Sequence, residues 1–506
     1  MKKETEPELM TRRDFARFTA VAGLSIMAAP YISLGATSAG KPITRVLGRT
    51  GFEATTLGLG GQASLQWPPA GENPEQIIIK ALSLGINYFD TSNLYGPSQL
   101  NYGKAFRALN VIPGNPGYDE VKRRSFFLAS KTHLRYAQGE PTTERHVKES
   151  TNGLPGSKTV DDVKRTLSQI FGDGKGNYPP GAYVDLFQIH SLRTIDDVEA
   201  IYEGLENPDP KAERIGALAA LKDYRDGTNL TGLNPKEEKL IRHIGITGHL
   251  SSPVLMECLQ RDEGNLIDTL LVALNANDRR YFSHQYNVIP LAVAKNVGLI
   301  AMKVFADGAM YGKGNFFSRA PEHVVRLVGS SRLPSKPLIQ YTLSTPGIAT
   351  TIIGIGHIDQ DRKRCQLVQN LAAAQLSGPL DDGRRRKIEQ LAAQAKEGKT
   401  NYFQLEAEVL SPPRAVAVSQ EMQGDFRVAQ LAWQTAYAGD QPLSHYEIFR
   451  DQEKIGRVDH QPQTTKKPFA FQERLNDRMA HRYRLAAVDA SGRMAGSGEF
   501  VLPVIG

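Results

Sequence analysis

The sequence is poor in cysteine and tryptophan, with two of each in 506 residues. Cys258 and Cys365 stand far apart, so the chain has no CxxC pair of the kind that binds structural zinc. HExxH spacing is also absent. The other histidines that we inspected for metal binding are scattered, at His133, His146, His243, His249 and His284. We expect no metal site, and we interpret both cysteines as buried free thiols.

A strong excess of one charge is missing as well. The chain has 61 lysines and arginines against 54 aspartates and glutamates, a formal net charge of +7. The basic residues form no stripe interleaved with aromatic side chains, so we expect no nucleic-acid partner. A content of 40% apolar and 23% charged residues suits a soluble globular enzyme. The length predicts two or three domains.

Long apolar runs are absent except for a short one near the N terminus. Residues 11–40, "TRRDFARFTAVAGLSIMAAPYISLGATSAG", have a charged start, an apolar stretch and small residues at the end. This is the layout of a signal peptide. The run is short for a membrane span and contains Gly23 and Pro30, so we expect no stable span in the mature protein.

Adjacent arginines precede this apolar run. Arg12 and Arg13, followed by Phe15 and Arg17, resemble the twin-arginine motif of the Tat export pathway, which carries folded proteins. The resemblance implies a Tat-type signal peptide over residues 1–39, the Tat machinery as a partner, and a periplasmic or otherwise exported protein. The alternatives are a fortuitous arginine pair in a Sec signal and an uncleaved anchor.

From about residue 54, short apolar segments alternate with amphipathic ones. The eight apolar segments span residues 54–61, 86–90, 126–131, 184–190, 241–248, 268–274, 298–305 and 350–356. Most are rich in Val, Ile, Leu and Phe, as strands of a parallel sheet buried on both faces are. Eight β/α units predict a TIM (β/α)8 barrel, which we place at residues 43–400. A doubly wound open sheet is the alternative.

Helical patterns lie between these segments. The first, residues 74–85, begins with Pro74 and ends at Gly85. Residues 159–172 and 284–298 have similar lengths, and Pro290 predicts a kink or an interruption in the latter.

Three longer insertions interrupt the units, at residues 111–122, 139–158 and 306–335. Long irregular segments in compact domains are usually functional loops or lids.

The C-terminal part has a different texture. Residues 411–506 show alternating apolar and polar positions separated by Gly and Asp turns, which predicts a small antiparallel β-sandwich. Its inward positions are Trp433, Tyr446, Ile448, Tyr483 and Leu485. The pattern resembles a fibronectin type III domain. We find no catalytic cluster there, and expect a packing or binding module with a protein or glycan partner.

Polar residues follow the carboxyl ends of consecutive barrel strands. Asp90 and Tyr95 follow the second strand, Lys131 ends the third, and His190 ends the fourth. Each has an ordinary explanation: a helix cap, a surface aromatic, a solvated lysine and a hydrogen-bonded core histidine. In a barrel, however, all four lie at the face that carries the active site.

The four side chains together suit one chemistry. An ammonium beside a phenol lowers the phenol pKa, and a carboxylate holds the ammonium in place. A histidine beside the phenol orients a carbonyl and relays a proton. The result is a positioned proton donor for an oxygen that becomes negative, as hydride delivery to a carbonyl requires.

The segments "YFDTSNLYG", "FFLASKTH" and "DLFQIHSL", which carry these residues, resemble the motifs of the aldo-keto reductase family. The opening "RVLGRTGFEATTLGLGG" resembles the N-terminal hairpin and first strand of that family. The resemblance covers residues 43–375. It implies that Asp90, Tyr95, Lys131 and His190 form the catalytic tetrad: Tyr95 as general acid, Lys131 held by Asp90, and His190 positioning the carbonyl.

The same resemblance implies NADP(H) as cofactor, extended across the C-terminal face of the barrel. Thr247 and Gly248 match the place where many relatives carry a Ser-Asn pair for the nicotinamide amide. Because Thr-Gly lacks an amide side chain, Asn275 is the candidate that supplies one.

Two further segments resemble the nucleotide-binding parts of the family. Residues 302–308 resemble its pyrophosphate-binding loop, which implies Lys303, Phe305 and Gly308 as contacts. Residues 352–370 resemble its adenosine-phosphate segment. The candidates there are Gly354, Gly356, Arg364 and Asn370.

A Rossmann fingerprint is the competing interpretation of Gly354-x-Gly356-x-x-Asp359. The third glycine is missing, and the motif stands at the end of the αβ series, so we do not favour it.

We therefore expect an NADP(H)-dependent oxidoreductase that interconverts a carbonyl and an alcohol. Polar, glycine-rich insertions with Tyr136 and Tyr311 suit a sugar or another polar carbonyl. The alternative is a nucleotide-binding barrel that acts as a non-catalytic binding or regulatory module at the cell envelope.

Overall fold

The computed structural model describes residues 41–277, 283–314, 316–395 and 410–505. The signal peptide predicted for residues 1–39 lies outside them. Within the described ranges, no helix is long and apolar enough to cross a membrane.

Eight parallel strands close into a barrel, in the order β3, β4, β5, β7, β9, β10, β11, β12 and back to β3. Each predicted apolar segment supplies one strand. Their bounds are β3 (Leu57–Leu59), β4 (Tyr88–Asp90), β5 (Phe127–Thr132), β7 (Val184–Ile189), β9 (Ile241–Gly248), β10 (Thr269–Ala273), β11 (Gly298–Met302) and β12 (Ile348–Ile353). The predicted TIM barrel is confirmed, and both the open sheet and the Rossmann fingerprint are wrong.

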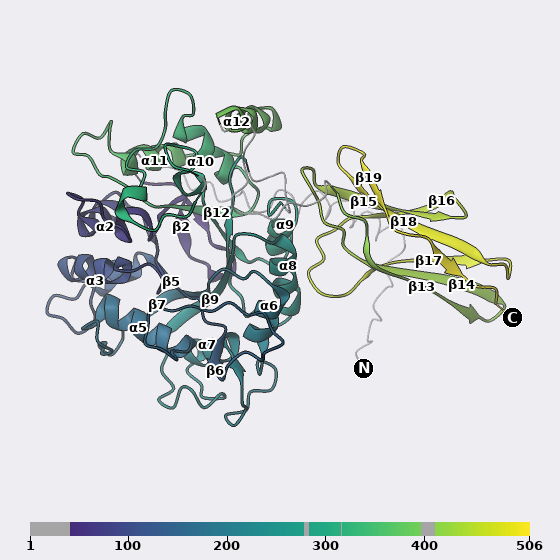
Figure 1. Cartoon of the computed structure of the whole chain (residues 1–506), viewed down its shortest axis with the longest axis horizontal. Helices are drawn as coiled ribbons and strands as arrows, with labels where there is room; N and C mark the ends of the chain where they lie inside the picture. The colour runs from purple at the N-terminus through teal and green to yellow at the C-terminus, as the bar shows by residue number, and fades with distance from the viewer. Residues whose placement is uncertain (1–40, 278–282, 315, 396–409, 506) are drawn as a thin grey trace, which may run out of the picture. The chain divides into compact units, whose positions relative to one another are not determined.

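Helices surround the strands, as Figure 1 shows. They are α2 (Pro74–Ser83), α3 (Ser98–Ala108), α4 (Glu120–Arg124), α5 (Thr159–Phe171), α6 (Ile195–Tyr202), α7 (Ala217–Asp226), α8 (Ser252–Arg261), α9 (Val288–Ala294), α10 (Ser335–Leu343), α11 (Gln366–Ala374) and α12 (Asp382–Ala395). The kink predicted at Pro290 is wrong, because α9 begins at Val288. Pro290 therefore lies in the first turn, where a missing N–H costs little.

The barrel interior is filled by a small apolar core of its own. Tyr88, Phe127, Leu186, Leu271 and Ile300 belong to it, and each is almost completely buried. Because side chains alternate along a strand, the inner-facing residue two positions after Tyr88 is Asp90. The apolar core thus lies directly beneath the polar residues at the carboxyl ends of the strands.

A short hairpin closes the opposite end of the barrel. Strands β1 (Thr44–Val46) and β2 (Glu53–Thr55) pair antiparallel, as predicted. The turn packs so tightly that a Cβ on Gly48 would lie 2.2 Å from the backbone nitrogen of Gly298, the first residue of β11. Only the carboxyl-end face is left for a site.

The insertions are mostly irregular. Residues 306–335 contain two short 3-10 turns, η5 (Ala306–Gly308) and η6 (Pro321–His323). The segment at residues 139–158 follows β6 (Tyr136–Gln138). This short strand pairs antiparallel with β8 (Ile215–Gly216), and we did not predict this pair of strands.

The C-terminal segment forms two antiparallel sheets, as expected. One contains β13 (Arg414–Gln423), β14 (Phe426–Gln434) and β17 (Phe469–Leu475). The other contains β15 (Leu443–Arg450), β16 (Glu453–Asp459), β18 (His481–Asp489), β19 (Met494–Gly496) and β20 (Phe500–Leu502). Both sheets contribute to one core, in which the predicted inward residues Trp433, Tyr446, Ile448, Tyr483 and Leu485 are all fully buried. Its likeness to a fibronectin type III domain stays a prediction.

Trp433 is the largest side chain of this core and stacks on Phe469 at 5.9 Å between ring centres. We expect Trp433→Ala in the full chain to lower the free energy of unfolding of the C-terminal domain by about 3–5 kcal/mol. Chemical denaturation followed by circular dichroism measures this. Met494→Ala, at a side chain that is 50% exposed, is the control. A loss for Trp433→Ala as small as that of the control would contradict the assigned core.

Candidate active site

A buried ion pair lies at the carboxyl end of β4 and β5. Lys131 Nζ donates to Asp90 Oδ1 at 2.5 Å and to the Thr91 carbonyl at 2.8 Å. Both charged side chains are 1% exposed. The structure therefore contains the contact that the sequence predicted between the acid and the lysine.

Tyr95 and His190 complete the cluster. Lys131 Nζ lies 4.9 Å from the centre of the Tyr95 ring. The Tyr95 and His190 rings meet edge to face, with centres 5.7 Å apart. All four predicted side chains thus meet on one face of the barrel.

The loop that carries Tyr95 is fixed by its own turn residues. Beyond the end of β4, Thr91 N donates to Ala129 O at 2.9 Å, and Asn93 N donates to Lys131 O at 3.1 Å. The buried Asn93 amide also donates to the carbonyl of Asp162 on α5 at 2.9 Å. The strand ladder therefore continues into the loop, and Tyr95 starts from an anchored backbone.

The charge environment of Tyr95 differs from our expectation. Burial raises the pKa of Tyr95 well above its usual value, and the carboxylates of Asp90 and Asp307 raise it further. The predicted lowering of this pKa by Lys131 is wrong for the protein alone, because burial and the two carboxylates raise it instead. The phenol is protonated at neutral pH and is available as a donor.

Burial disfavours the charged form of both partners of the ion pair. It raises the pKa of the Asp90 carboxyl and lowers the pKa of the Lys131 ammonium, while the attraction between the two opposes each shift. The attraction between the two charges therefore offsets part of the cost of removing them from water.

Two further histidines flank His190, although they are scattered along the sequence. The ring centres of His133 and His249 lie 5.9 and 6.4 Å from that of His190. Each of the three rings has its Nδ1 next to a serine hydroxyl, in the pairs His133–Ser150, His190–Ser92 and His249–Ser191. We call these three side chains the histidine cluster.

The histidine cluster is uncharged at neutral pH. Burial lowers the pKa of His133 to about 3, and nearby Arg135 and Arg193 add to the effect. Burial also lowers the pKa of His190 and His249 well below the usual value. A neutral imidazole has one N–H donor and one acceptor nitrogen, and in each of these rings Nδ1 is next to a serine.

The described residues contain no group of three His, Cys, Asp or Glu side chains that could hold a metal ion.

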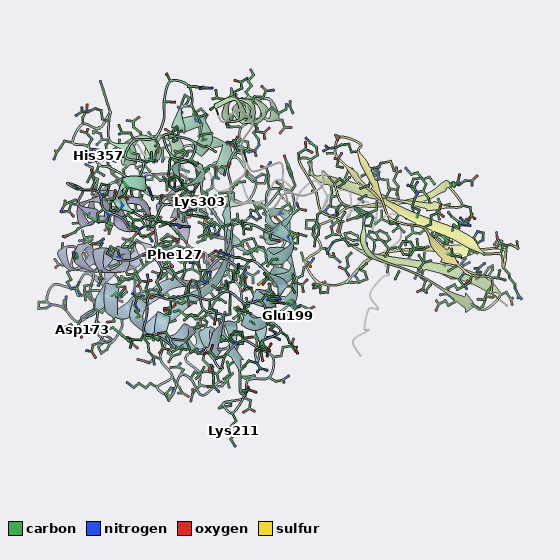
Figure 2. All side chains as sticks on the ribbon, viewed as in Figure 1. Phe127, Asp173, Glu199, Lys211, Lys303 and His357 are labelled. Atoms are coloured by element: carbon green, nitrogen blue, oxygen red, sulfur yellow. The ribbon has the colours of Figure 1, made fainter. Side chains whose placement is uncertain are left out.

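A cavity opens beside Tyr95 and Asp90. Its walls come from the loop after β3 (residues 60–63), the loop after β11 (residues 302–308), part of the insertion at residues 318–328, and the end of β12 (residues 352–354). Lys303, labelled in Figure 2, lies on this wall. The predicted cofactor residues Lys303, Phe305, Gly308 and Gly354 therefore share one cavity with half of the tetrad.

Comparison with known proteins agrees with this geometry. The model of the aldo/keto reductase family matches residues 56–392. The chain belongs to the aldo/keto reductase family. Members of this family are oxidoreductases, and the barrel described above is the fold of that family.

Individual relatives are distant. L-galactose dehydrogenase of Arabidopsis thaliana is 24% identical over 65% of this chain and 88% of that protein. An uncharacterized oxidoreductase of Bacillus subtilis is 22% identical over 64% of this chain and 90% of that protein. Among solved structures, an aldo/keto reductase from Klebsiella pneumoniae in complex with NADP and acetate is 15% identical, with a TM-score of 0.42. The match covers 72% of this chain and 99% of the chain of that structure.

Three predicted cofactor residues support the site from behind the cavity wall. The Thr247 hydroxyl accepts a hydrogen bond from Ser191 N at 2.7 Å. A Cβ on Gly248 would meet Leu255 Cδ1 at 2.6 Å, so this position packs against α8. Asn275 donates to Lys303 O at 3.3 Å, which holds the loop after β11. Direct nucleotide contacts from these three residues stay a prediction.

The candidate residues of the predicted adenosine-phosphate segment, residues 352–370, lie in different surroundings. A Cβ on Gly356 would lie 2.2 Å from Val325 O, so the insertion packs directly on the loop after β12. Arg364 is 71% exposed and forms ion pairs with Asp359 and Asp361. Nothing in the described residues places its guanidinium at the cavity.

Asn370 is different. It is fully buried on α11, and neither its amide nitrogen nor its amide oxygen has a partner within the described part of the chain. A buried amide without partners is costly, and a ligand edge with both a donor and an acceptor would satisfy it. Asn370 is not among the residues that line the cavity, so its contact with a nucleotide base stays a prediction.

The loop after β11 concentrates positive charge and backbone strain. Lys303, Ala306 and Asp307 all have left-handed φ angles, between 49° and 62°. Lys303 Nζ lies 3.2 Å and Lys313 Nζ 2.5 Å from the Asp307 carboxylate. Although burial raises the pKa of Asp307, Lys303 and Lys313 lower it to about 2. Two lysines held in place by one carboxylate suit a phosphate-bearing ligand.

The proposed use of Tyr136 as a substrate contact is wrong. Tyr136 is fully buried, and its hydroxyl contacts Glu203 and Arg145 instead.

The neutral state of His133 can be tested directly. The pKa of about 3 predicts that the His133 ring stays unprotonated down to about pH 4. Because this pKa lies below the unfolded value, the stability contributed by His133 is full above pH 6.5 and is lost as the pH falls towards 3. Histidine proton NMR, assigned with His133→Asn, measures the titration. A His133 midpoint near 6.5 would contradict the buried, neutral cluster.

Proposed function

We propose that the protein is an NADP(H)-dependent oxidoreductase that interconverts a carbonyl and an alcohol, with Tyr95 as the general acid and base. The observation that carries this proposal is the convergence of Asp90, Tyr95, Lys131 and His190 at one end of the barrel, next to a cavity whose wall includes Lys303. Family membership supports the same reaction class.

The roles follow from the geometry. When bound, NADPH supplies the hydride for the carbonyl carbon. The protonated Tyr95 hydroxyl donates its proton to the carbonyl oxygen as that oxygen gains negative charge. His190, whose Nδ1 is next to Ser92, has its other ring nitrogen available for the same oxygen. Lys131 stabilises the phenolate that remains, and Asp90 holds Lys131 in position. In the oxidation direction Tyr95 accepts the proton.

Three side chains are our candidates for binding a phosphorylated dinucleotide. Lys303 and Lys313 would hold phosphates, and Asn370 would hold the base. A structural relative from Klebsiella pneumoniae is described as a complex with NADP, which agrees with this choice.

The substrate we propose is a sugar or a similarly hydroxylated carbonyl compound. Uncharged histidine rings supply both donors and acceptors, and hydroxyl groups need both. The relative from Arabidopsis thaliana is named for L-galactose, and its likeness covers most of that protein.

We also propose that the protein is exported by the Tat pathway to the periplasm or beyond, with its nucleotide bound before export. Free NADPH is expected to be scarce there, so a retained nucleotide would have to be recycled by paired substrates or an external partner. A cluster beside the cavity supports retention: Glu72, 3% exposed, contacts Arg326 of the insertion and accepts from His357 at 2.7 Å. These contacts join the insertion to the loops after β3 and β12. Figure 2 labels His357 and Lys303.

A non-catalytic binding module at the cell envelope is the second candidate. The two-sheet C-terminal domain favours it, because such a domain suits a protein or glycan partner.

The two candidates differ in turnover. We expect Tyr95→Phe to lower kcat by about 10²–10⁴-fold without weakening nucleotide binding, because only the proton donor is lost. NADPH oxidation with a panel of aldoses and simple aldehydes measures the rates, and fluorescence titration measures binding. Equal rates for the two proteins would defeat the mechanism. Wild-type protein that binds NADPH and turns nothing over would favour the binding module, and a preference for apolar aldehydes would defeat the sugar proposal.

Nucleotide retention gives a separate prediction. Native mass spectrometry of protein recovered from the periplasm is expected to show one bound NADP(H), and its absence would sink the retained-cofactor proposal. Arg326→Ala is expected to speed nucleotide release about tenfold, if the contact with Glu72 is worth about 1.4 kcal/mol. Arg384→Ala is the control, because Arg384 is 73% exposed and pairs with Asp381. Equal release rates in both variants would contradict the role of the Glu72 contact.

A further inference from the structure

A polar layer crosses the barrel at the level of the ion pair. Lys131 on β5 is the register partner of Gln188 on β7, Gln188 of Gly245 on β9, and Gly245 of Thr269 on β10. Register partners in a parallel sheet point to the same face. Since Lys131 points into the barrel towards Asp90, Gln188 and Thr269 point into the barrel as well.

Gly245 makes room in this layer. A Cβ at Gly245 would lie 2.2 Å from Thr269 Oγ1 and 3.1 Å from Gln188 Cγ. The side chains of Gln188 and Thr269 therefore approach each other across the backbone of β9, and only glycine permits this at the position between them. Both side chains are fully buried.

Four buried polar atoms of Gln188, Thr269 and Asp90 lack a hydrogen-bond partner within the described residues. Gln188 Oε1 and Nε2, Thr269 Oγ1 and Asp90 Oδ2 are buried and have no hydrogen-bond partner among the described residues. Lys131 occupies only the other oxygen of Asp90, Oδ1. Buried polar atoms without partners are rare and costly, so four at one level of a barrel call for a common explanation.

We propose that Gln188 is a positioning residue that orients Asp90. Its amide N–H donates to Asp90 Oδ2, and the Thr269 hydroxyl donates to Gln188 Oε1. The Thr269 hydroxyl thereby selects the amide orientation that presents nitrogen, rather than oxygen, to the carboxylate. Asp90 is then held at both oxygens, one by Lys131 and one by Gln188.

The electrostatics agree with this geometry. The Gln188 amide is among the groups that lower the pKa of Asp90, against burial, which raises it. The other groups around the Asp90 carboxyl are the ammonium groups of Lys131 and Lys303, and the phenols of Tyr88, Tyr95 and Tyr102. All three phenols have a raised pKa and remain neutral when Asp90 titrates. Removal of the Gln188 donor should therefore appear in the titration of Asp90 itself.

The inference rests on the proposed function only in its consequence for turnover, so the test has two readouts. Gln188→Met keeps the length of the side chain and removes both hydrogen-bonding atoms. Thr350→Val is the matched control, since Thr350 Oγ1 is another buried and unpartnered hydroxyl of the described barrel, outside this layer.

The first readout is carbon-13 NMR of labelled aspartate in the full chain without nucleotide, with Asp90 assigned through Asp90→Asn. We expect the pKa of Asp90 to rise by about one unit in Gln188→Met, because a donor to the charged form is lost. It should not move in Thr350→Val, and Gln188→Asn should lie between the two. An unchanged Asp90 titration in folded Gln188→Met would overturn the inference, whether or not the wild type turns over any substrate.

The second readout is the rate. In an active enzyme, Gln188→Met is expected to lower kcat about tenfold with KM nearly constant, and to move the acid limb of the kcat profile upward by the same amount as the NMR titration. A packing defect alone would lower the unfolding temperature and leave the acid limb in place, which would also overturn the inference. A wild type without turnover would defeat the proposed function and leave the NMR result to decide on Gln188.

Discussion

The structure depends on one costly contact, the ion pair between Asp90 and Lys131 inside the barrel. Taking two charges out of water is repaid only where geometry is good and the remaining hydrogen-bonding capacity is satisfied. The barrel provides the first condition, because adjacent parallel strands place the two residues side by side. The apolar core beneath them keeps water out from below. The second condition is met only in part by the contacts seen, and this is why the layer that contains Gln188 is of interest.

Around this pair, the site is built from neutral groups. Burial keeps the Tyr95 phenol protonated and the histidine cluster uncharged. A neutral phenol is a poor acid by itself, so its proton moves only when the substrate oxygen develops charge. In the proposed mechanism, Lys131 would then stabilise the phenolate, and its position is fixed by Asp90. In this account the selectivity of the proton transfer comes from burial as much as from the lysine.

Much of this site follows from the sequence, because strand order and strand ends can be identified from apolar segments. Once Asp90, Lys131 and His190 are placed at the ends of neighbouring parallel strands, their convergence is a geometric consequence. Other features depend on three-dimensional detail. The direction of the Tyr95 pKa shift follows from how deeply the phenol is buried and from the carboxylates of Asp90 and Asp307.

The histidine cluster shows the same limit. His249 approaches His190 only because β7 and β9 are neighbours, and a single histidine in a sequence is most often a core residue. Likewise, the register that brings Gln188 beside Gly245 cannot be read from two separate segments of sequence. Residue types at strand ends and the contact between Asp90 and Lys131 were therefore predictable, while the other hydrogen-bond partners and the protonation states were not.

The most direct test of the central claim is a crystal structure of the protein with NADP⁺ bound. The account predicts that the nucleotide occupies the cavity beside Tyr95, with its phosphates at Lys303 and its nicotinamide next to the tetrad. It also predicts that Lys131 still contacts Asp90. A nucleotide bound outside this cavity, or one whose binding separates Lys131 from Asp90, would contradict it.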